Sequence, residues 1–136
     1  MDTVPEPQAL LAAMPFAVAC GIELHSVAPE EVHASLAWAP ERGTAGAVLH
    51  GGALMTLADT AGAVCAFLNL PVGASTSTLE SKTNFFRAVR AGAVTAVARP
   101  LHAGRTTIVV QTDVFDDDGR RVAQTTQTQA ILAPAD

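Results

Sequence analysis

The chain has 136 residues, of which 49% are apolar and only 15% charged, so it is long enough and apolar enough to fold as one domain. This composition excludes an intrinsically disordered chain. The formal net charge of −5 argues against nucleic acid or an anionic membrane as a general partner.

The pattern of the first half predicts a single domain over residues 1–136 that begins with an N-terminal extension over residues 1–15. Helix-forming residues run up to Pro15, which is expected to end a short helix. Alternation of apolar and polar side chains favours strands after it. The expected elements are a helix at 8–14, strands at 22–27 and 31–38, a loop at 40–46 and a helix at 51–68.

Threonine, valine, isoleucine and phenylalanine dominate the second half, which predicts strands separated by glycine-containing turns. The pair Asp118-Gly119 favours a tight hairpin before the last strand. Polar residues on both faces of that strand favour a position at an edge or an interface. The four strands are expected at 76–88, 93–101, 106–115 and 122–132. Two strands, one apolar helix and four strands predict an α+β domain whose antiparallel sheet curls around the helix.

The helix expected at 51–68 is apolar on most of its circumference, so we expect it to be buried nearly all round. Several of its side chains are small. They would let a second helix pack closely, or would leave room for a ligand. These residues are Ala53, Ala58, Gly62, Ala63 and Ala66.

Asp59 interrupts this apolar helix, with no lysine or arginine within eight positions on either side. An ionised carboxylate in apolar surroundings costs several kcal/mol unless it is paired, so such a residue is usually hydrogen-bonded, protonated or functional. One interpretation is structural: the run is two helices, and Asp59 caps the second. The other is that Asp59 is a nucleophile or a general base.

His50, Gly51 and Gly52 lie where the loop enters this helix. The first N–H groups of a helix lack internal acceptors and carry the positive end of its dipole. Glycine allows close approach, so the geometry suits an anion or a carbonyl oxygen that gains negative charge. Alternatively, the glycines only make the turn and His50 caps it. The four histidines show no metal-ligand spacing, so no metal site is predicted.

Gly51 and Asp59 are eight residues apart, which is ~12 Å along one helix. They cannot both reach one carbonyl group from the same chain. If both act in one site, the second residue must come from another subunit, and a two-fold dimer creates two equivalent sites. The motif therefore predicts a homodimer.

Two cysteines without a C-x-x-C spacing predict free, buried thiols in a reducing compartment. The acidic N-terminus does not resemble a secretory signal. The most apolar run, residues 61–70, is shorter than the ~20 residues that a membrane span needs. We therefore expect a cytoplasmic protein without a membrane partner.

The motif HGGALMTLAD, residues 50–59, resembles the hotdog-fold acyl-CoA thioesterases, in particular the PaaI-like branch of the 4-hydroxybenzoyl-CoA thioesterase superfamily. Their pattern is His-Gly-Gly, six residues, and then Asp or Glu. The resemblance covers about residues 16–132. Supporting segments are KTNFFRAVRAG at 82–92, HAGRT at 102–106 and GRRVAQTTQT at 119–128.

This resemblance implies a long central helix wrapped by a curved antiparallel sheet, with dimers formed edge to edge and often paired into tetramers. It implies hydrolysis of an acyl-CoA or aryl-acyl-CoA thioester without a cofactor, since coenzyme A is part of the substrate. The Gly51 N–H would polarise the thioester carbonyl, and His50 would position that turn or the carbonyl. Asp59 of the opposite subunit would attack the carbonyl or activate water.

Other roles follow from the resemblance less directly. A hydroxyl on the strand after the helix holds water in some relatives, and Thr78 is the matching residue, with Ser77 as the alternative. The chain departs from many relatives at Thr44, where they have Asn. A branch of the family that uses Glu in place of Asp often has Thr one turn later, and this chain has Ala63 at that position. The residues expected to bind substrate or coenzyme A are Gly52, Ser77, Arg87, Arg90 and Arg105.

Two other functions remain open from the sequence. A hotdog domain of this kind can bind acyl-CoA or a small aryl ligand without turning it over, although such a binder would gain nothing from a buried acid. A hotdog hydratase or dehydratase would place its histidine and acid in different motifs, and the sequence contains neither.

Overall fold

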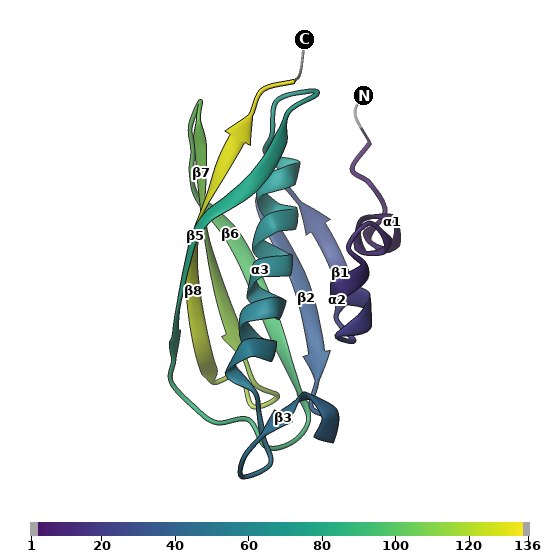
Figure 1. Ribbon diagram of the computed structural model, residues 1–136, viewed down its shortest axis with the longest axis vertical. Helices are drawn as coiled ribbons and strands as arrows, with labels where there is room; N and C mark the ends of the chain where they lie inside the picture. The colour runs from purple at the N-terminus through teal and green to yellow at the C-terminus, as the bar shows by residue number, and fades with distance from the viewer. Residues whose placement is uncertain (1–2, 135–136) are drawn as a thin grey trace.

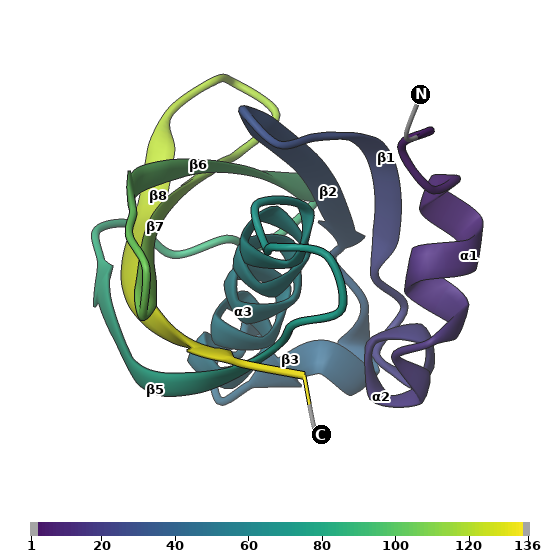
Figure 2. The same ribbon diagram turned by 90° about the horizontal axis from the view of Figure 1, so that it is seen from above.

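A six-stranded antiparallel sheet curls around helix α3 (Gly51–Leu68) in the computed structural model, which describes residues 3–134. Figure 2, viewed along this helix, shows the sheet enclosing most of its circumference. The strand order is β1-β2-β6-β7-β8-β5. This arrangement confirms the α+β fold with a central helix and a curved sheet, and α3 has the predicted bounds. The strands are β1 (Glu23–Ala28), β2 (Glu31–Ala37), β5 (Ser75–Phe85), β6 (Ala93–Ala103), β7 (Thr107–Phe115) and β8 (Arg121–Leu132).

The N-terminal segment forms two short helices, α1 (Pro7–Ala12) and α2 (Pro15–Ala19), where one was predicted. Pro15 begins α2 because a proline is well accommodated at the first position of a helix, where its missing N–H has no partner to lose. Leu11 is buried and joins the hydrophobic core. Both helices lie beside β1, on the side of α3 that the sheet leaves open (Figure 2).

The segment before α3 forms a 3₁₀ turn, η1 (Pro40–Arg42), and a small hairpin of β3 (Gly43–Thr44) and β4 (Val48–Leu49). The hairpin lies at the end of the molecule where α3 begins (Figure 1). The loop predicted over 40–46 is therefore partly ordered into regular structure.

The last strand, β8, lies between β7 and β5, so the predicted edge position is wrong. The edge strands of the sheet are β1 and β5. Three polar residues of β8 are buried on its inner face: Thr125, Gln127 and Gln129. The predicted hairpin before β8 is confirmed, and Gly119 adopts the positive φ of 77° that this turn requires.

Helix α3 is half buried, so the prediction of burial nearly all round is wrong for the single chain. Met55, Asp59 and Phe67 are exposed on its open side. Most of its small residues face the chain's own sheet: Ala58, Gly62 and Ala66 are buried, so they cannot receive a second helix. Within the described residues, α3 is long and apolar enough to cross a membrane by length and composition, but here it is the core helix.

Candidate active site

Asp59 lies on the open side of α3, and its carboxylate is held from the sheet. Its Oδ1 atom accepts a hydrogen bond from Gln127 Nε2 at 3.1 Å, and Thr78 Oγ1 lies 3.5 Å from the same oxygen. Gln127 is fully buried on β8, and Thr78 is exposed on β5. Because α3 continues without a break through Asp59, the alternative in which this residue caps a second helix is excluded.

A second glutamine supports the threonine in this arrangement. Gln129 Nε2 donates to Thr78 Oγ1 at 2.7 Å, and Thr76 Oγ1 donates to Gln129 Oε1 at 3.1 Å. Thr78 is therefore the β5 hydroxyl that meets the acid. Ser77 faces the opposite side of the strand, because neighbouring residues of a strand alternate between its faces.

Gln127 and Gln129 are site residues that were not predicted from the sequence. The available signal was their spacing: both occupy inward positions of a strand, where a buried polar side chain needs a hydrogen-bond partner. Which partner they meet depends on the pairing of β8 with β5 and on how α3 packs over both.

The start of α3 is capped by His50, whose Nδ1 accepts a hydrogen bond from the Gly52 N–H at 2.7 Å. A Cβ atom on Gly52 would lie 2.9 Å from that nitrogen, so a glycine is needed for the cap. The structural interpretation is thus confirmed: His50 caps the helix, and Gly52 leaves room for the cap. Within residues 3–134, no acceptor bonds to the Gly51 N–H, which leaves that donor free for another molecule.

Gly51 and Asp59 open into different cavities. Gly51 lines a cavity of about 410 Å³ together with Phe85 and Arg87. Asp59 lines one of about 500 Å³ together with Thr78. The two cavities share no residue, so Gly51 and Asp59 of one chain face separate spaces. His50 and Gly52 line another cavity, of about 570 Å³, which shares Phe16 and Thr56 with the cavity at Asp59.

Of the three predicted arginines, Arg87 lies nearest to the start of α3, because it lines the same cavity as Gly51. Arg105 is carried by the turn between β6 and β7, at the opposite end of the sheet from the start of α3 (Figure 1). A contact between Arg105 and a ligand at Gly51 of the same chain is therefore not expected.

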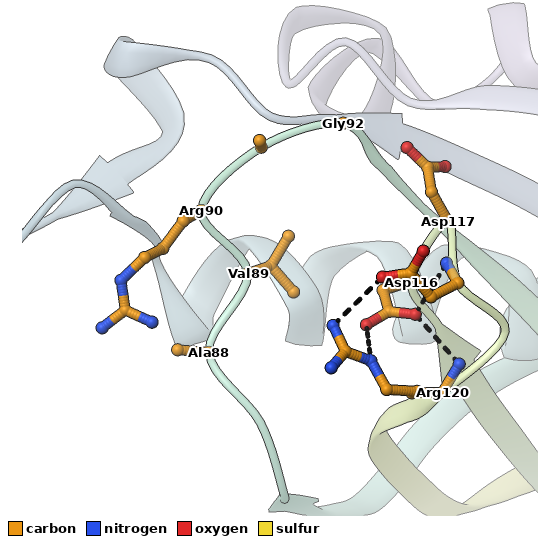
Figure 3. Close-up of a pocket in the computed structure, with 9 residues that line it drawn as sticks. Ala88, Val89, Arg90, Gly92, Asp116, Asp117 and Arg120 are labelled. Atoms are coloured by element: carbon orange, nitrogen blue, oxygen red, sulfur yellow. Dashed lines mark hydrogen bonds and ion pairs between the residues drawn. The ribbon is translucent and has the colours of Figure 1, made fainter.

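Arg90 lines a third cavity, of about 430 Å³, beside the β7–β8 turn. Figure 3 shows its side chain pointing away from the ion pair between Asp116 and Arg120, whose atoms are 2.9 Å apart. The backbone N–H of Arg120 is the main cause that holds the pKa of Asp116 below its usual range. Asp117 and Asp118 also line this cavity, so its charge is unfavourable for a phosphate group.

No group of three potential metal-binding side chains occurs within the part of the chain that the structure describes. Cys20 and Cys65 are free thiols there, and Cys65 is buried while Cys20 is partly exposed. The candidate site therefore consists of a carboxylate, its polar supports and a free helix N–H.

A helix wrapped by a curved sheet, with His-Gly-Gly at its start and an acid on its open side, defines a hotdog domain of the thioesterase type. The family described as the thioesterase superfamily matches residues 46–123, which is more than half of the chain. The chain belongs to this superfamily.

Known relatives agree with this assignment. The 1,4-dihydroxy-2-naphthoyl-CoA hydrolase of Escherichia coli is 38% identical over 85 residues, which are 62% of this chain and 62% of that protein. The chain thus matches less than two thirds of the length of such curated relatives. A crystal structure of thioesterase PA1618 from Pseudomonas aeruginosa superposes with a TM-score of 0.90 at 30% identity, covering 96% of each chain. The PaaI protein of E. coli shares the fold, with a TM-score of 0.85 at 23% identity over 94% of this chain and 91% of that one.

Proposed function

We propose that this protein is a homodimeric thioesterase that hydrolyses an acyl-CoA or aryl-acyl-CoA thioester to the free acid and coenzyme A. The observation that carries the proposal is the fixed carboxylate of Asp59. Gln127 and Thr78 both engage Oδ1, while no donor among residues 3–134 bonds to Oδ2. A carboxylate held by one oxygen presents the other to a thioester or to a water molecule.

The Gly51 N–H supplies the second group that this chemistry needs. It is a free donor at the positive end of an 18-residue helix, where it would stabilise the negative charge that develops on the carbonyl oxygen. His50 would act through the turn, because its ring holds the Gly52 N–H and thereby orients the neighbouring donor. If Asp59 acts as a base, it takes a proton from the water molecule whose oxygen bonds to the carbonyl carbon. If Asp59 attacks directly, an anhydride between Asp59 and the acyl group forms, and water then hydrolyses it to the free acid. In both routes the C–S bond breaks and coenzyme A leaves as the thiolate, which takes up a proton from solvent.

A second subunit completes the site in this proposal. The separate cavities at Gly51 and Asp59 support it, as does the unpaired edge of β5. Large apolar side chains are exposed around the cavity that contains Asp59, as a covered interface would require: Phe16 is 69% exposed and Met55 41%. Pairing of dimers into tetramers and a cytoplasmic location, where acyl-CoA thioesters are made, belong to the same proposal.

Arg87 is the arginine best placed to meet the phosphates of coenzyme A when the thioester lies at Gly51. The roles of Arg90 and Arg105 stay predictions, and both would have to act from outside the cavity at Gly51. The 1,4-dihydroxy-2-naphthoyl-CoA hydrolase among the relatives supports an acyl-CoA substrate.

The proposal is tested by incubating the protein with short, medium and aryl acyl-CoA thioesters and trapping the released thiol with a dye. The dimer is verified in the same sample by light scattering. We expect thiol release by the wild type and its loss in Asp59→Asn, which removes the negative charge but keeps an oxygen that accepts from Gln127. A folded dimer that releases no thiol from any of the thioesters would contradict the proposal.

The alternative function, binding without turnover, makes a different prediction in the same experiment. Calorimetry would then show acyl-CoA binding that is equally strong in the wild type and in Asp59→Asn, and no thiol would appear. The supports built around Asp59 favour the enzyme, because a binding protein has no need to fix this carboxylate.

A further inference from the structure

Two cavities adjoin each other along the open side of α3. The larger one, of about 500 Å³, contains Asp59. The smaller one, of about 190 Å³, lies between α1 and α3. Met14 and Ala63 line both, so their side chains form the boundary between the acid and the smaller space.

The smaller cavity is apolar throughout its lining. Besides the two shared residues, it is bounded by Leu10, Ala13, Val64 and Phe67. Among residues 3–134, no charged or hydrogen-bonding side chain lines it, so it offers nothing to a phosphate, a sugar or a hydroxylated acid. Its chemistry suits a hydrocarbon.

The smaller cavity and Asp59 lie along the same face of α3. Asp59, Ala63 and Phe67 follow each other at intervals of four residues, so they lie on one face of α3. The distance from Asp59 to Phe67 along the axis is ~12 Å. A chain that starts at the carboxylate and follows this face passes Ala63 and ends beside the exposed ring of Phe67.

We propose that the smaller cavity binds the distal end of an unbranched acyl chain, and that Met14 sets the width of the passage into it. This inference rests on the proposed function, in which the thioester lies beside Asp59. A cavity of about 190 Å³ holds roughly six methylene groups, if each takes the ~30 Å³ that a water molecule occupies. The unbranched, flexible side chain of methionine adapts to such a chain more readily than a β-branched one.

The experiment measures kcat/KM of the wild-type dimer for unbranched thioesters from acetyl-CoA to dodecanoyl-CoA, with benzoyl-CoA and phenylacetyl-CoA alongside. Each methylene group that enters the cavity is expected to raise kcat/KM by about fourfold until the space is full. A preference for the aryl thioesters over all unbranched ones would overturn the inference.

Ala13→Phe fills the smaller cavity without touching the one that contains Asp59. We expect this variant to lose at least about tenfold in kcat/KM for the longest chains while acetyl-CoA turnover is unchanged. Ala12→Phe is the matched control, because Ala12 is also exposed but lines neither cavity. In Met14→Ala, the wider passage is expected to shift the preferred chain length upward.

The outcomes separate this inference from the proposed function. If the wild type hydrolyses thioesters but Ala13→Phe and Met14→Ala keep its chain-length profile, the inference fails and the thioesterase stands. If no thioester is hydrolysed, the proposed function fails. If Ala13→Phe weakens the dimer and leaves the profile unchanged, a second copy of the chain fills the cavity, which also overturns the inference.

Discussion

Gly62 and Gln127 fit together so closely that no side chain can be added between them. A Cβ atom on Gly62 would lie 2.0 Å from Gln127 Oε1 and 2.6 Å from Gln127 Cδ. This fit places the amide beneath α3, where its nitrogen reaches Asp59 Oδ1 at 3.1 Å. The amide oxygen is buried without a hydrogen-bond partner among the described residues, so the bond to Asp59 is the main polar contact that orients this side chain.

Gly62→Ala is therefore expected to push Gln127 away from Asp59. Within a helix, alanine in place of glycine normally stabilises by about 0.5–1 kcal/mol. Here we expect a loss of stability of about 1–3 kcal/mol, because the buried amide cannot move without strain. Turnover should fall as well. Chemical denaturation and steady-state kinetics measure the two effects.

A double-mutant cycle separates the clash from other effects of this change. In a Gln127→Ala background the obstacle is gone, so the same Gly62→Ala substitution should stabilise the fold. The sign of its effect on unfolding free energy is then opposite in the two backgrounds. An equal effect in both would mean that Gly62 and Gln127 are not coupled.

The sequence was sufficient for the parts of the site that depend on one helix. Local composition predicted α3 with its bounds, and the spacing of Gly51 and Asp59 predicted that one chain separates them. Gln127 could not be predicted, because its role depends on strand order and register, which are tertiary properties. The same limit explains the error about β8: polar residues on a strand indicate an edge or a buried network, and only the pairing with β5 decides between them.

The expected burial of Asp59 failed for a related reason. A run of apolar residues around α3 does not reveal whether the covering surface belongs to the same chain. In the single chain, Asp59 is exposed along with Met55 and Phe67. The apolar composition of this side is what an interface between subunits would require, and the proposed dimer accounts for it.

Replacing Gly51 by proline removes the N–H that is proposed to polarise the carbonyl. Gly51 is the first residue of α3, a position that favours proline, and His50 has the extended conformation, with ψ of 135°, that a following proline requires. We expect kcat to fall by about 10²–10³ with the fold retained. Circular dichroism and thiol-release kinetics measure both properties.

Gly51→Ala is the control for this change. It keeps the N–H and introduces the same Cβ atom, which would lie 3.3 Å from the ring of Phe85. Its kcat should stay close to that of the wild type. Equal losses in the alanine and proline variants would assign the effect to Phe85 and not to the N–H.

Mixing two inactive variants tests whether one site draws on two subunits. Gly51→Pro and Asp59→Asn are each expected to abolish both sites of their own homodimer. After unfolding and refolding together, half of the dimers should be mixed, and each mixed dimer has one intact site. Activity should therefore return to roughly a quarter of the wild-type value, as two-fold symmetry requires. No recovery in a sample that contains mixed dimers would place both groups in one subunit's site.

The thiol of Cys65 should make the fold sensitive to alkaline pH. This side chain is fully buried in α3, and burial raises the pKa of its thiol from 9.0 to about 11. Between these values the unfolded chain loses the proton and the folded chain keeps it. The folded state then binds more protons, so the stabilising contribution is complete below pH 9 and is lost as the pH rises to about 11.

We expect the loss in unfolding free energy to reach ~2 kcal/mol at pH 11 and ~3 kcal/mol once the thiol is fully ionised in both states, since each of the two pKa units corresponds to about 1.4 kcal/mol. The alkaline range is favourable for the measurement because the chain has no tyrosine and Lys82 is its single lysine. Urea denaturation under reducing conditions from pH 8 to pH 11 gives the slope.

Cys65→Ala should be less stable at neutral pH, because it leaves a cavity, but its unfolding free energy should be nearly independent of pH in this range. Cys20→Ala is the matched control for the loss of a cysteine at another position. A slope that survives in Cys65→Ala would assign the alkaline loss to another group.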